Sequence, residues 1–362
     1  MVRELKVSAP GRICLFGEHQ DYLNLPVITA AINLRIGIHG KKRNDNLFVL
    51  NFADIQKKDQ FEIKYPIPYK KERDYLRSAV NVLQRQGIRI PCGYDCSVHG
   101  EIPINSGTSS SSALIVAWIK FLLTISGDER RDDTIEIARL AHQAEVVEFN
   151  EPGGMMDHYA TSVGGVLFID FRNDGSVSRL SSNICPFVLG DSLEAKDTMG
   201  ILERVKGGIV DILKKLSKEN SAIDIRNLEF SEIENQMDQF SEDQIQLLRG
   251  ALNNRNLTLK AYQRFKDRTM ESKTLGEMLS ECQTILRNDL KISTPKIDRM
   301  IDAGIRAGAT GGKINGSGGG GCMFVCAPKN PEKVATAIEN EGGKAHIINI
   351  DQGVRLDQVV EE

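Results

Sequence analysis

The chain has 362 residues, of which 41% are hydrophobic, and its 46 basic and 49 acidic residues give a formal net charge of −3. This length suits two ordinary domains or one large two-lobed unit, and the balanced charge argues against a nucleic-acid or anionic-membrane binder. Seven scattered cysteines predict reduced, mostly buried thiols in a cytoplasmic protein. The N-terminus lacks a signal-peptide hydrophobic region, and no apolar run reaches the roughly 18 residues of a spanning helix.

Strand-like and helical patterns divide the chain into two regimes. Up to about residue 180, strand-like runs alternate with two helical patterns, which predicts an α/β or α+β lobe. In GYDCSVHGEI, Tyr94, Cys96 and Val98 alternate with polar residues, as in a strand with one buried face. From about 197 to 312 the pattern is largely helical, and short strands return at GCMFVCAP and AHIINI. The second lobe is therefore expected to hold helices over a small sheet.

A cluster of polar residues lies near the N-terminus, in APGRICLFGEHQDYLNLPVITAAI. Arg12, Glu18, His19 and Asp21 are charged or titratable groups set among apolar and glycine residues. Burying so many polar groups is costly unless they bind one another or a polar ligand. Two interpretations stay open, namely a structural salt-bridge cluster and a site for a sugar, whose many hydroxyls such a set would satisfy.

Small hydroxyl residues from 106 to 112 lead directly into an apolar helical run in GEIPINSGTSSSSALIVAWIKFLL. A helix start has about four free backbone N–H groups and a partial positive charge, so a Gly/Ser loop there can bind phosphate. Serine hydroxyls would add donors and a magnesium ligand. Serines before a helix are also ordinary N-caps, so the phosphate hypothesis needs a second phosphate-binding element.

The segment AEVVEFNEPGGMMDHYATSVGG carries two carboxylates that are 12 positions apart. A capping pattern from Asp133 to Glu136 predicts a helix that ends near Glu145. Pro152 and two glycines then break this helix, and Asp157 follows in a second short helix. The two carboxylates could serve one magnesium ion and one substrate hydroxyl, or could lie on solvated helix faces.

The run INGSGGGGCMFVCAP, residues 314–328, packs five glycines between an apolar run and a strand-like one. Glycine costs about 0.5–1 kcal/mol relative to alanine inside a helix or strand, so five of them would weaken an element that gained nothing else. A ligand that approaches the backbone closely would explain them, and so would a plain set of turns. As the second phosphate-binding element, the loop 316–321 could pack beside the loop of small hydroxyl residues before the helix, here called the serine loop, and hold it open.

Together these segments resemble the superfamily of galactokinase, homoserine kinase, mevalonate kinase and phosphomevalonate kinase (GHMP kinases), and galactokinases most. PGRICLFGEHQDY is similar to the galactokinase signature, GYDCSVHGEIPINSGTSSSSAL to the phosphate-loop segment, AEVVEFNEPGGMMDHY to the metal-binding and catalytic segment, and residues 275–322 to the C-terminal helices and third glycine motif. The resemblance covers most of residues 5–330. It implies a two-lobed α+β fold, with a lobe like ribosomal protein S5 domain 2 in residues 1–185 and a ferredoxin-like α/β lobe with extra helices in 186–362.

The resemblance also implies roles for individual residues. Asp157 would accept the proton of a sugar hydroxyl or act as an electrostatic anchor, and Arg12 would lower the pKa of Asp157 and offset phosphoryl charge. ATP phosphates would lie on Gly107, Thr108, Ser109, Ser110, Ser111 and Ser112, Mg²⁺ on Ser111 and Glu145, and the sugar on Glu18, His19, Asp21, Gly154, Asp157, Gly318 and Gly319. The implied partners are ATP, Mg²⁺ and a small sugar, without nucleic acid or membrane, in a monomer or homodimer.

Departures from the galactokinase pattern concern the substrate. Cys14 stands where galactokinases usually have Asn, Thr108 where they have Leu, Ser112 where they have Ala, and His158 where they have Gln. The third loop lacks its usual Phe, and the stretch 187–198 is expected to reshape the sugar end of the pocket. The predicted acceptor is therefore the anomeric hydroxyl of galactose or of a related aldose, and the alternatives are a uronic acid, a heptose and mevalonate. A non-catalytic sugar sensor and a serine hydrolase are the other candidate classes. The full-length serine loop argues against the sensor, and the missing nucleophile elbow argues against the hydrolase.

Overall fold

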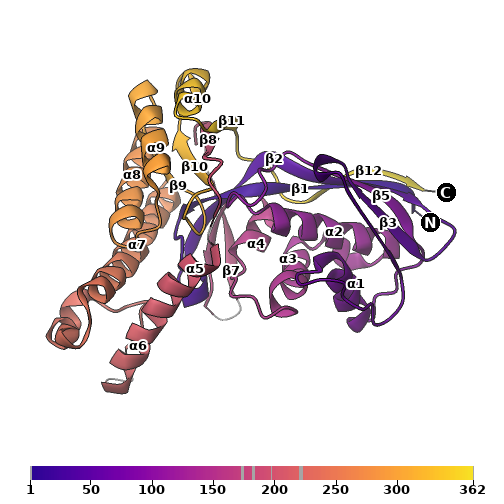
Figure 1. The fold of residues 1–362 in the computed structure, drawn as a ribbon, viewed down its shortest axis with the longest axis horizontal. Coiled ribbons are helices and arrows are strands. Elements are labelled where there is room, and N and C mark those ends of the chain that lie inside the picture. Colours follow the sequence, from indigo (N-terminus) through magenta and orange to yellow (C-terminus); the bar gives the residue numbers. More distant parts are fainter. Residues whose placement is uncertain (1, 173–174, 182–183, 197, 220–222, 362) are drawn as a thin grey trace.

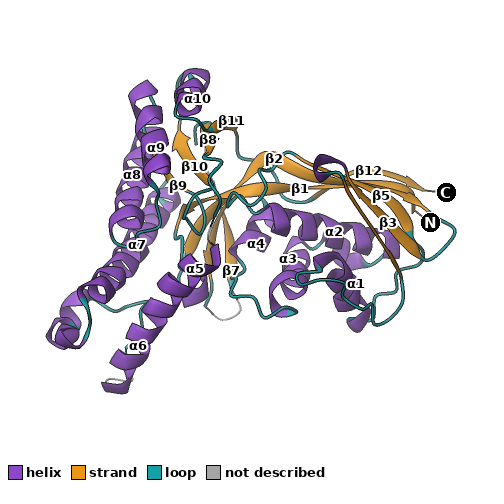
Figure 2. Ribbon diagram, viewed as in Figure 1, coloured by secondary structure: helices purple, strands orange, loops and turns teal. Residues whose placement is uncertain are grey.

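The computed structural model describes residues 2–361 except 173–174, 182–183, 197 and 220–222, and the chain forms two sheets with their helices (Figure 1). The larger sheet has eight strands in the order β12-β1-β2-β5-β3-β4, with β6 pairing to β2 and β7 to β6. Among the described strands of this sheet, β3 and β5 alone pair in parallel. Its strands are β1 Val2–Phe16, β2 Val27–Lys42, β3 Leu47–Phe52, β4 Lys57–Glu62, β5 Tyr94–Gly100, β6 Val166–Asp170, β7 Ser176–Leu180 and β12 Arg355–Glu361. Four helices lie along one face of this sheet (Figure 2), namely α1 Tyr75–Arg85, α2 Ser110–Ser126, α3 Thr134–His142 and α4 Met156–Val163.

The smaller sheet is antiparallel, with strand order β11-β8-β10-β9. Its strands are β8 Phe187–Asp191, β9 Gly311–Ile314, β10 Cys322–Cys326 and β11 Lys344–Ile348. The helices of this half are α5 Thr198–Leu202, α6 Gly208–Glu219, α7 Glu242–Lys266, α8 Ser272–Asn288, α9 Pro295–Ala307 and α10 Pro331–Asn340. The expected two-lobed α+β arrangement, with helices and a small sheet in the second half, is confirmed.

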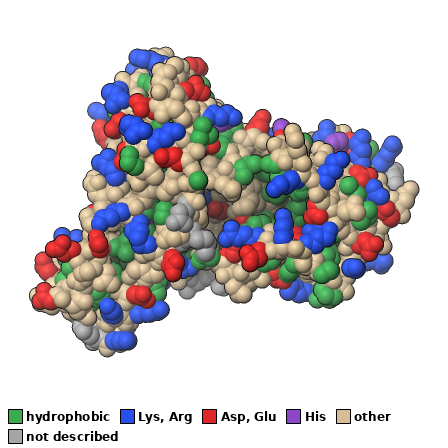
Figure 3. Space-filling model, viewed as in Figure 1, with side chains coloured by type: hydrophobic (Ala, Val, Ile, Leu, Met, Phe, Trp, Pro, Cys, Tyr) green, Lys and Arg blue, Asp and Glu red, His purple; other side chains and the backbone are tan. Residues whose placement is uncertain are grey.

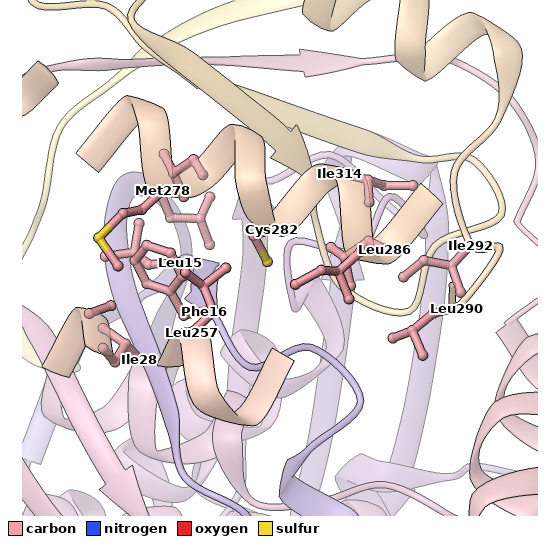
Figure 4. Close-up of a cluster of buried hydrophobic side chains, with 14 of the residues drawn as sticks. Leu15, Phe16, Ile28, Leu257, Met278, Cys282, Leu286, Leu290, Ile292 and Ile314 are labelled. Carbon is pink, nitrogen blue, oxygen red and sulfur yellow. The ribbon is translucent and has the colours of Figure 1, made fainter. Parts of the chain in front are cut away.

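Long-range packing joins the two halves into one core. The ends of β1 and β2 lie against α7, α8 and β9 (Figure 4). The side chains that meet there are Leu15, Phe16, Ile28, Leu257, Met278, Cys282, Leu286, Leu290, Ile292 and Ile314. Because β1 contributes to this core and also carries Arg12 farther back, the packing fixes Arg12 relative to the second lobe.

The end of the chain returns to the first lobe. β12 pairs antiparallel with β1, so that Val2 lies opposite Glu361 and both termini lie at the same end of the molecule (Figure 1). The division of the chain at residues 185 and 186 stays a prediction, and any boundary has to allow for this crossing strand. Within the described ranges, no helix combines the length and apolar character that crossing a bilayer requires.

Local patterns in the sequence predicted most of these helices and strands. Tyr94, Cys96 and Val98 are buried on β5 while their neighbours are exposed, as the alternation predicts. Among α1 to α4, the sequence patterns missed only α1, because its buried face contains polar groups. One of them, Arg77, is ion-paired with Asp59 and Asp74 inside the protein, and these polar groups hide the apolar stripe of α1.

The expectation that all cysteines are free thiols is wrong for two of them. Cys185 and Cys326 form a disulfide, and the other five remain thiols. In the antiparallel register of β8 and β10, Cys326 lies opposite Phe187, which places it near Cys185. The two residues are 141 positions apart in the chain, so their spacing in the sequence gave no sign of the bond.

Candidate active site

Four segments that are distant in the sequence meet beside the start of α2. They are the middle of β1, the loop 103–109, the start of α4 and the glycine loop 315–321 between β9 and β10. Arg12 N donates to Thr108 O (3.2 Å), which joins β1 to the loop 103–109, and Cys322 N, directly after the glycine loop, donates to Ser106 O (2.7 Å). The surface is hollowed in Figure 3 where α4, α5 and the start of α2 lie in Figure 1, and Lys and Arg side chains flank the hollow.

Arg12 and Asp157 form the central ion pair of this region. Arg12 Nε and Nη2 lie 2.7 and 2.6 Å from Asp157 Oδ1, and Arg12 Nη1 donates to Gly107 O. The Arg12 side chain is 5% exposed and that of Asp157 is 29% exposed, so the carboxylate can be reached by a ligand. Burial acts to raise the pKa of Asp157, but the charge and hydrogen bond of Arg12, together with Ser109 and His158, outweigh it and hold that pKa below its usual value. Asp157 is therefore ionised at neutral pH.

Hydroxyl groups hold the loop before α2 in shape. Thr108 Oγ1 lies 2.9 Å from Ser106 Oγ. Thr108 and Ser112 are buried, whereas Ser110 is half-buried and Ser111 is exposed in the first turn of α2. Of the residues predicted to bind ATP, the structure thus turns Ser110 and Ser111 toward the outside at a helix N-terminus and uses Thr108 to build the loop.

Ser109 stands out among these serines. It precedes α2 in a left-handed conformation, with φ of 62°, and its side chain does not cap the helix. Its buried hydroxyl makes no well-aligned hydrogen bond with the described residues, yet it lies close enough to Asp157 to lower the pKa of that carboxyl group. A buried hydroxyl without a well-aligned hydrogen bond is costly, so Ser109 is suited to bind a ligand beside Asp157.

The glycine loop packs directly on the serine loop, as predicted for a second element. Asn315 connects β1 to the serine loop, since its side chain accepts from Cys14 N (2.9 Å) and donates to Gly107 O (2.8 Å). A Cβ atom on Gly316 would lie 2.9 Å from Gly107 O. Gly107 itself has φ of +87°, and a Cβ there would lie 2.7 Å from Asn315 O. Side chains at either glycine would push the two loops apart.

Gly318 and Gly319 lie on the side of the glycine loop that faces the second lobe. Gly319 N donates to Ile292 O (2.8 Å), and a Cβ on Gly318 would lie 2.5 Å from the same carbonyl oxygen. Both glycines were predicted to contact the substrate. Their close contacts bind the loop to the segment after α8, and their substrate role stays a prediction.

Asp21 and Gly154 lie in direct contact near Asp157. A methyl group on Gly154 would overlap the Asp21 carboxylate, so this position needs glycine for Asp21 to keep its place. Burial, together with the negative charge of Asp157, raises the pKa of Asp21 to about 6. Asp21 is therefore a carboxylate that titrates just below neutral pH, and no described residue forms an ion pair with it.

His19 is buried between the two lobes in its neutral form. Its Nδ1 lies 2.7 Å from Tyr22 Oη and its Nε2 lies 3.0 Å from Ser317 O. Because a carbonyl oxygen can only accept, Nε2 carries the proton and Nδ1 accepts from the tyrosine hydroxyl. Burial lowers the pKa of His19 to about 4. His19 thus ties the N-terminal motif to the glycine loop.

Glu18 points into the protein and not into the open part of the site. It is ion-paired with Lys313 of β9, and the two side chains are 1% and 0% exposed. Lys313 Nζ also donates to Cys14 O (3.0 Å) and Ile314 O (2.9 Å). Burial disfavours the charged amine, but the Glu18 carboxylate raises the pKa of Lys313 above its usual value. Of the two interpretations of the N-terminal cluster, the salt bridge holds for Glu18.

Glu145 and Ser111 are the predicted magnesium ligands. Glu145 lies in a π-helical turn, Gln143–Val147, that continues α3, and Asp133 caps the start of that helix as expected. His158 Nε2 lies 2.8 Å from Glu145 Oε2 and orients the carboxylate. Within the described residues, no group of three or more His, Cys, Asp or Glu could hold a metal ion. One carboxylate and one hydroxyl suit Mg²⁺, which takes most of its other ligands from phosphates and water.

Three residues of the region were not found from the sequence. Lys313 and Asn315 follow the helical regime in GGKING, and Lys196 lies in the stretch after β8. Each reaches residues more than 80 positions away, for example Asn315 to Gly107. The one available signal was that 187–198 departs from the galactokinase pattern, which marked the segment of Lys196 but not the residue.

Comparison with known proteins agrees with this geometry. The chain matches the GHMP kinases N terminal domain over residues 74–165, the GHMP kinases C terminal domain over 270–345 and the galactokinase galactose-binding signature over 3–42. It is 27% identical to a mevalonate kinase of Thermococcus onnurineus over 98% of both chains. It is 28% identical to a galactokinase of Pasteurella multocida over 90% of this chain and 85% of that protein.

The fold comparison agrees as well. The structure of Lactococcus lactis galactokinase complexed with galactose superposes with a TM-score of 0.85 and 21% identity, covering 97% of this chain and 95% of that one. The galactokinase signature contains Arg12, Glu18, His19 and Asp21, and the N-terminal domain match spans the serine loop and Asp157. The chain belongs to the GHMP kinase superfamily and has the two-lobed fold of these kinases.

Proposed function

We propose that the protein transfers the γ-phosphate of ATP to a hydroxyl group of a small sugar, with the anomeric hydroxyl of galactose or a related aldose as the acceptor. The observation that carries this proposal is the Arg12–Asp157 pair, held against Gly107 at the start of α2. A reachable, ionised carboxylate beside a cation and a free helix N-terminus is what transfer of phosphate to a hydroxyl requires.

In the proposed reaction, the acceptor hydroxyl oxygen forms a bond to the γ-phosphorus while the bond from that phosphorus to the bridging oxygen of ADP breaks. ADP leaves with the electron pair, and Asp157 takes the hydroxyl proton. Arg12 keeps Asp157 ionised beforehand and offsets charge on the moving phosphoryl group. Phosphoryl transfer depends chiefly on such positioning and electrostatic stabilisation.

The nucleotide would lie with its phosphates on the N-terminus of α2 and the hydroxyls of Ser109, Ser110 and Ser111. Ser111 and Glu145 would hold Mg²⁺, which when bound offsets the charge of the ATP phosphates. Ser109, whose buried hydroxyl lacks a well-aligned partner, would bind close to Asp157. These assignments are the ones that the resemblance to galactokinases implies for each of these positions.

The acceptor would lie beside Asp157 and Asp21. An ionised Asp21 accepts hydrogen bonds from hydroxyl groups, which favours a polyhydroxylated acceptor, and the match to the galactokinase galactose-binding signature supports this choice. Mevalonate is the second candidate, because relatives over almost the whole chain are mevalonate kinases. Uronic acids and heptoses fit the same groups as galactose does.

A coupled assay of ADP release with Mg-ATP tests the proposal. The panel would contain galactose, other aldoses, uronic acids, heptoses and mevalonate. We expect release that depends on one aldose and saturates with it. Release with mevalonate alone would move the protein to the second candidate, and tight sugar binding without any release would identify a sensor.

Substituting Gly154 is expected to damage acceptor use without unfolding the protein. In Gly154→Ala the added methyl overlaps Asp21 and displaces its carboxylate, so a charged hydrogen bond worth about 1.5–3 kcal/mol is lost, and kcat/KM for the acceptor falls by about ten- to a hundredfold. Gly207→Ala is the matched control, because a Cβ there meets nothing within 4 Å. An unchanged kcat/KM in Gly154→Ala would separate Asp21 from the acceptor site.

A further inference from the structure

One cation of the region has no part in the reaction described so far. Lys196 follows β8, in the stretch that differs from galactokinases, and its side chain lies across both loops of the site. A Cβ on Gly107 would lie 2.9 Å from Lys196 Nζ, and a Cβ on Gly321 would lie 2.8 Å from Lys196 Cδ. Lys196 therefore runs from the glycine loop to the glycine of the serine loop that also contacts Arg12.

Within the described residues, the charge of Lys196 has no partner of its own. No residue of the described chain makes a hydrogen bond or ion pair with its amine. The groups that face it are Arg12 of β1, Asp157 of α4, Cys322 of β10 and His19. Arg12 repels it, the Asp157 carboxylate is already paired with Arg12, and the Cys322 thiol and His19 are neutral near pH 7. Arg12 and Lys196 thus both lie against Gly107, and the nearby Asp157 carboxylate is paired with Arg12.

The usual structural explanation of a half-buried lysine does not apply here. The buried amines of Lys313 and Lys120 bond to carbonyl groups or carboxylates, whereas that of Lys196 bonds to none of the residues that the structure describes. Burial and the nearby Arg12 lower the pKa of Lys196 to about 8. An amine that is held beside another cation, at a helix N-terminus and without an acceptor, is arranged for an anion of high charge.

We propose that Lys196 is a third charged residue of the transfer site and binds the phosphoryl group as it moves from ATP to the acceptor. This inference rests on the proposed function. Its position on Gly107 places it on the nucleotide side of Asp157, while Asp21 and Gly154 mark the acceptor side. Lys196 keeps its proton throughout, and Asp157 alone takes the proton of the acceptor hydroxyl.

Nucleotide binding tests the proposal without any acceptor. In Lys196→Met we expect affinity for the β,γ-imido analogue of ATP, measured by calorimetry, to fall by about tenfold or more, and affinity for ADP to change by less than about twofold. Lys273→Met, whose side chain is 83% exposed on α8, should match the wild type for both. Equal losses for the analogue and ADP, or no loss, would overturn the proposal. Failure of the wild type to bind either nucleotide would instead overturn the proposed function.

The pH profile gives a second, independent readout. In the free enzyme Lys196 must be protonated, so kcat/KM for ATP should fall as the pH rises through about 8. Lys196→Arg keeps its charge and should move this fall to higher pH, and Lys196→Met should lower kcat by about a hundred- to a thousandfold. A fall at the same pH in Lys196→Arg would contradict the proposal. So would a Lys196→Met variant that raises only the KM of the acceptor, since it would assign the amine to an anionic acceptor group.

Discussion

Asp157→Asn is expected to lower kcat by about a thousandfold while the protein stays folded. The substitution keeps the shape of the side chain and an oxygen that can accept from Arg12, but it removes the negative charge. The acceptor hydroxyl then has no group to take its proton or to orient it, and general-base contributions of this kind are worth roughly 10²–10⁴ in rate. The same substitution leaves the Arg12 charge unmatched in a buried position.

ADP release at saturating acceptor checks this expectation, with the unfolding transition measured in parallel. Asp302→Asn on α9 is a suitable control, since Asp302 is exposed and belongs to none of the four segments of the site. Because the pKa of Asp157 lies below its usual value, ionisation of this residue should not limit kcat between pH 5 and 8. A variant that retains most of the wild-type kcat would exclude Asp157 both as base and as electrostatic anchor.

Lys313→Met is expected to reduce the free energy of unfolding by about 3–5 kcal/mol. Removing the amine leaves the Glu18 carboxylate buried and uncompensated, which is the costly way to break a buried ion pair. Removing both charges, in Glu18→Leu/Lys313→Met, should recover much of this loss, because apolar replacements of similar volume often match a buried pair.

Urea denaturation measures the free energy of unfolding of both variants, provided that its dependence on urea concentration has the same slope as in the wild type. Lys260→Met removes an exposed pair with Glu281, whose charged atoms are 3.9 Å apart, and should cost less than about 1 kcal/mol. A small effect of Lys313→Met would mean that Glu18 is not held by Lys313 in solution. Glu18 would then return to the list of groups that are free to bind the acceptor.

Local patterns predicted those parts of the site that depend on neighbouring residues. The helix from Asp133 follows from capping, and the turn before Asp157 follows from helix-breaking residues. The structure accordingly has Glu145 at the end of the first helix and Asp157 in the next one, as the sequence predicted. The glycine loop was expected beside the serine loop as the second phosphate-binding element, although a plain set of turns would also have explained its glycines. Steric needs of the backbone leave a clear mark on the sequence.

Contacts that depend on topology left no such mark. Glu18 and Lys313 are 295 positions apart, and nothing near Glu18 indicates that its partner comes from β9. Lys196 reaches Gly107 only because β8 lies beside β10 in the smaller sheet. The resemblance therefore assigned Glu18 to the sugar without revealing its partner, and Lys196, in a polar segment, was overlooked.

The most direct test of the central claim is to identify the phosphorylated product by ³¹P nuclear magnetic resonance after reaction with Mg-ATP and the acceptor found in the panel. Transfer to a sugar predicts a phosphate coupled to the anomeric proton of an aldose, and no such product from Asp157→Asn. A phosphate on the primary alcohol of mevalonate, or inorganic phosphate alone, would contradict the claim that the Arg12–Asp157 pair phosphorylates a sugar.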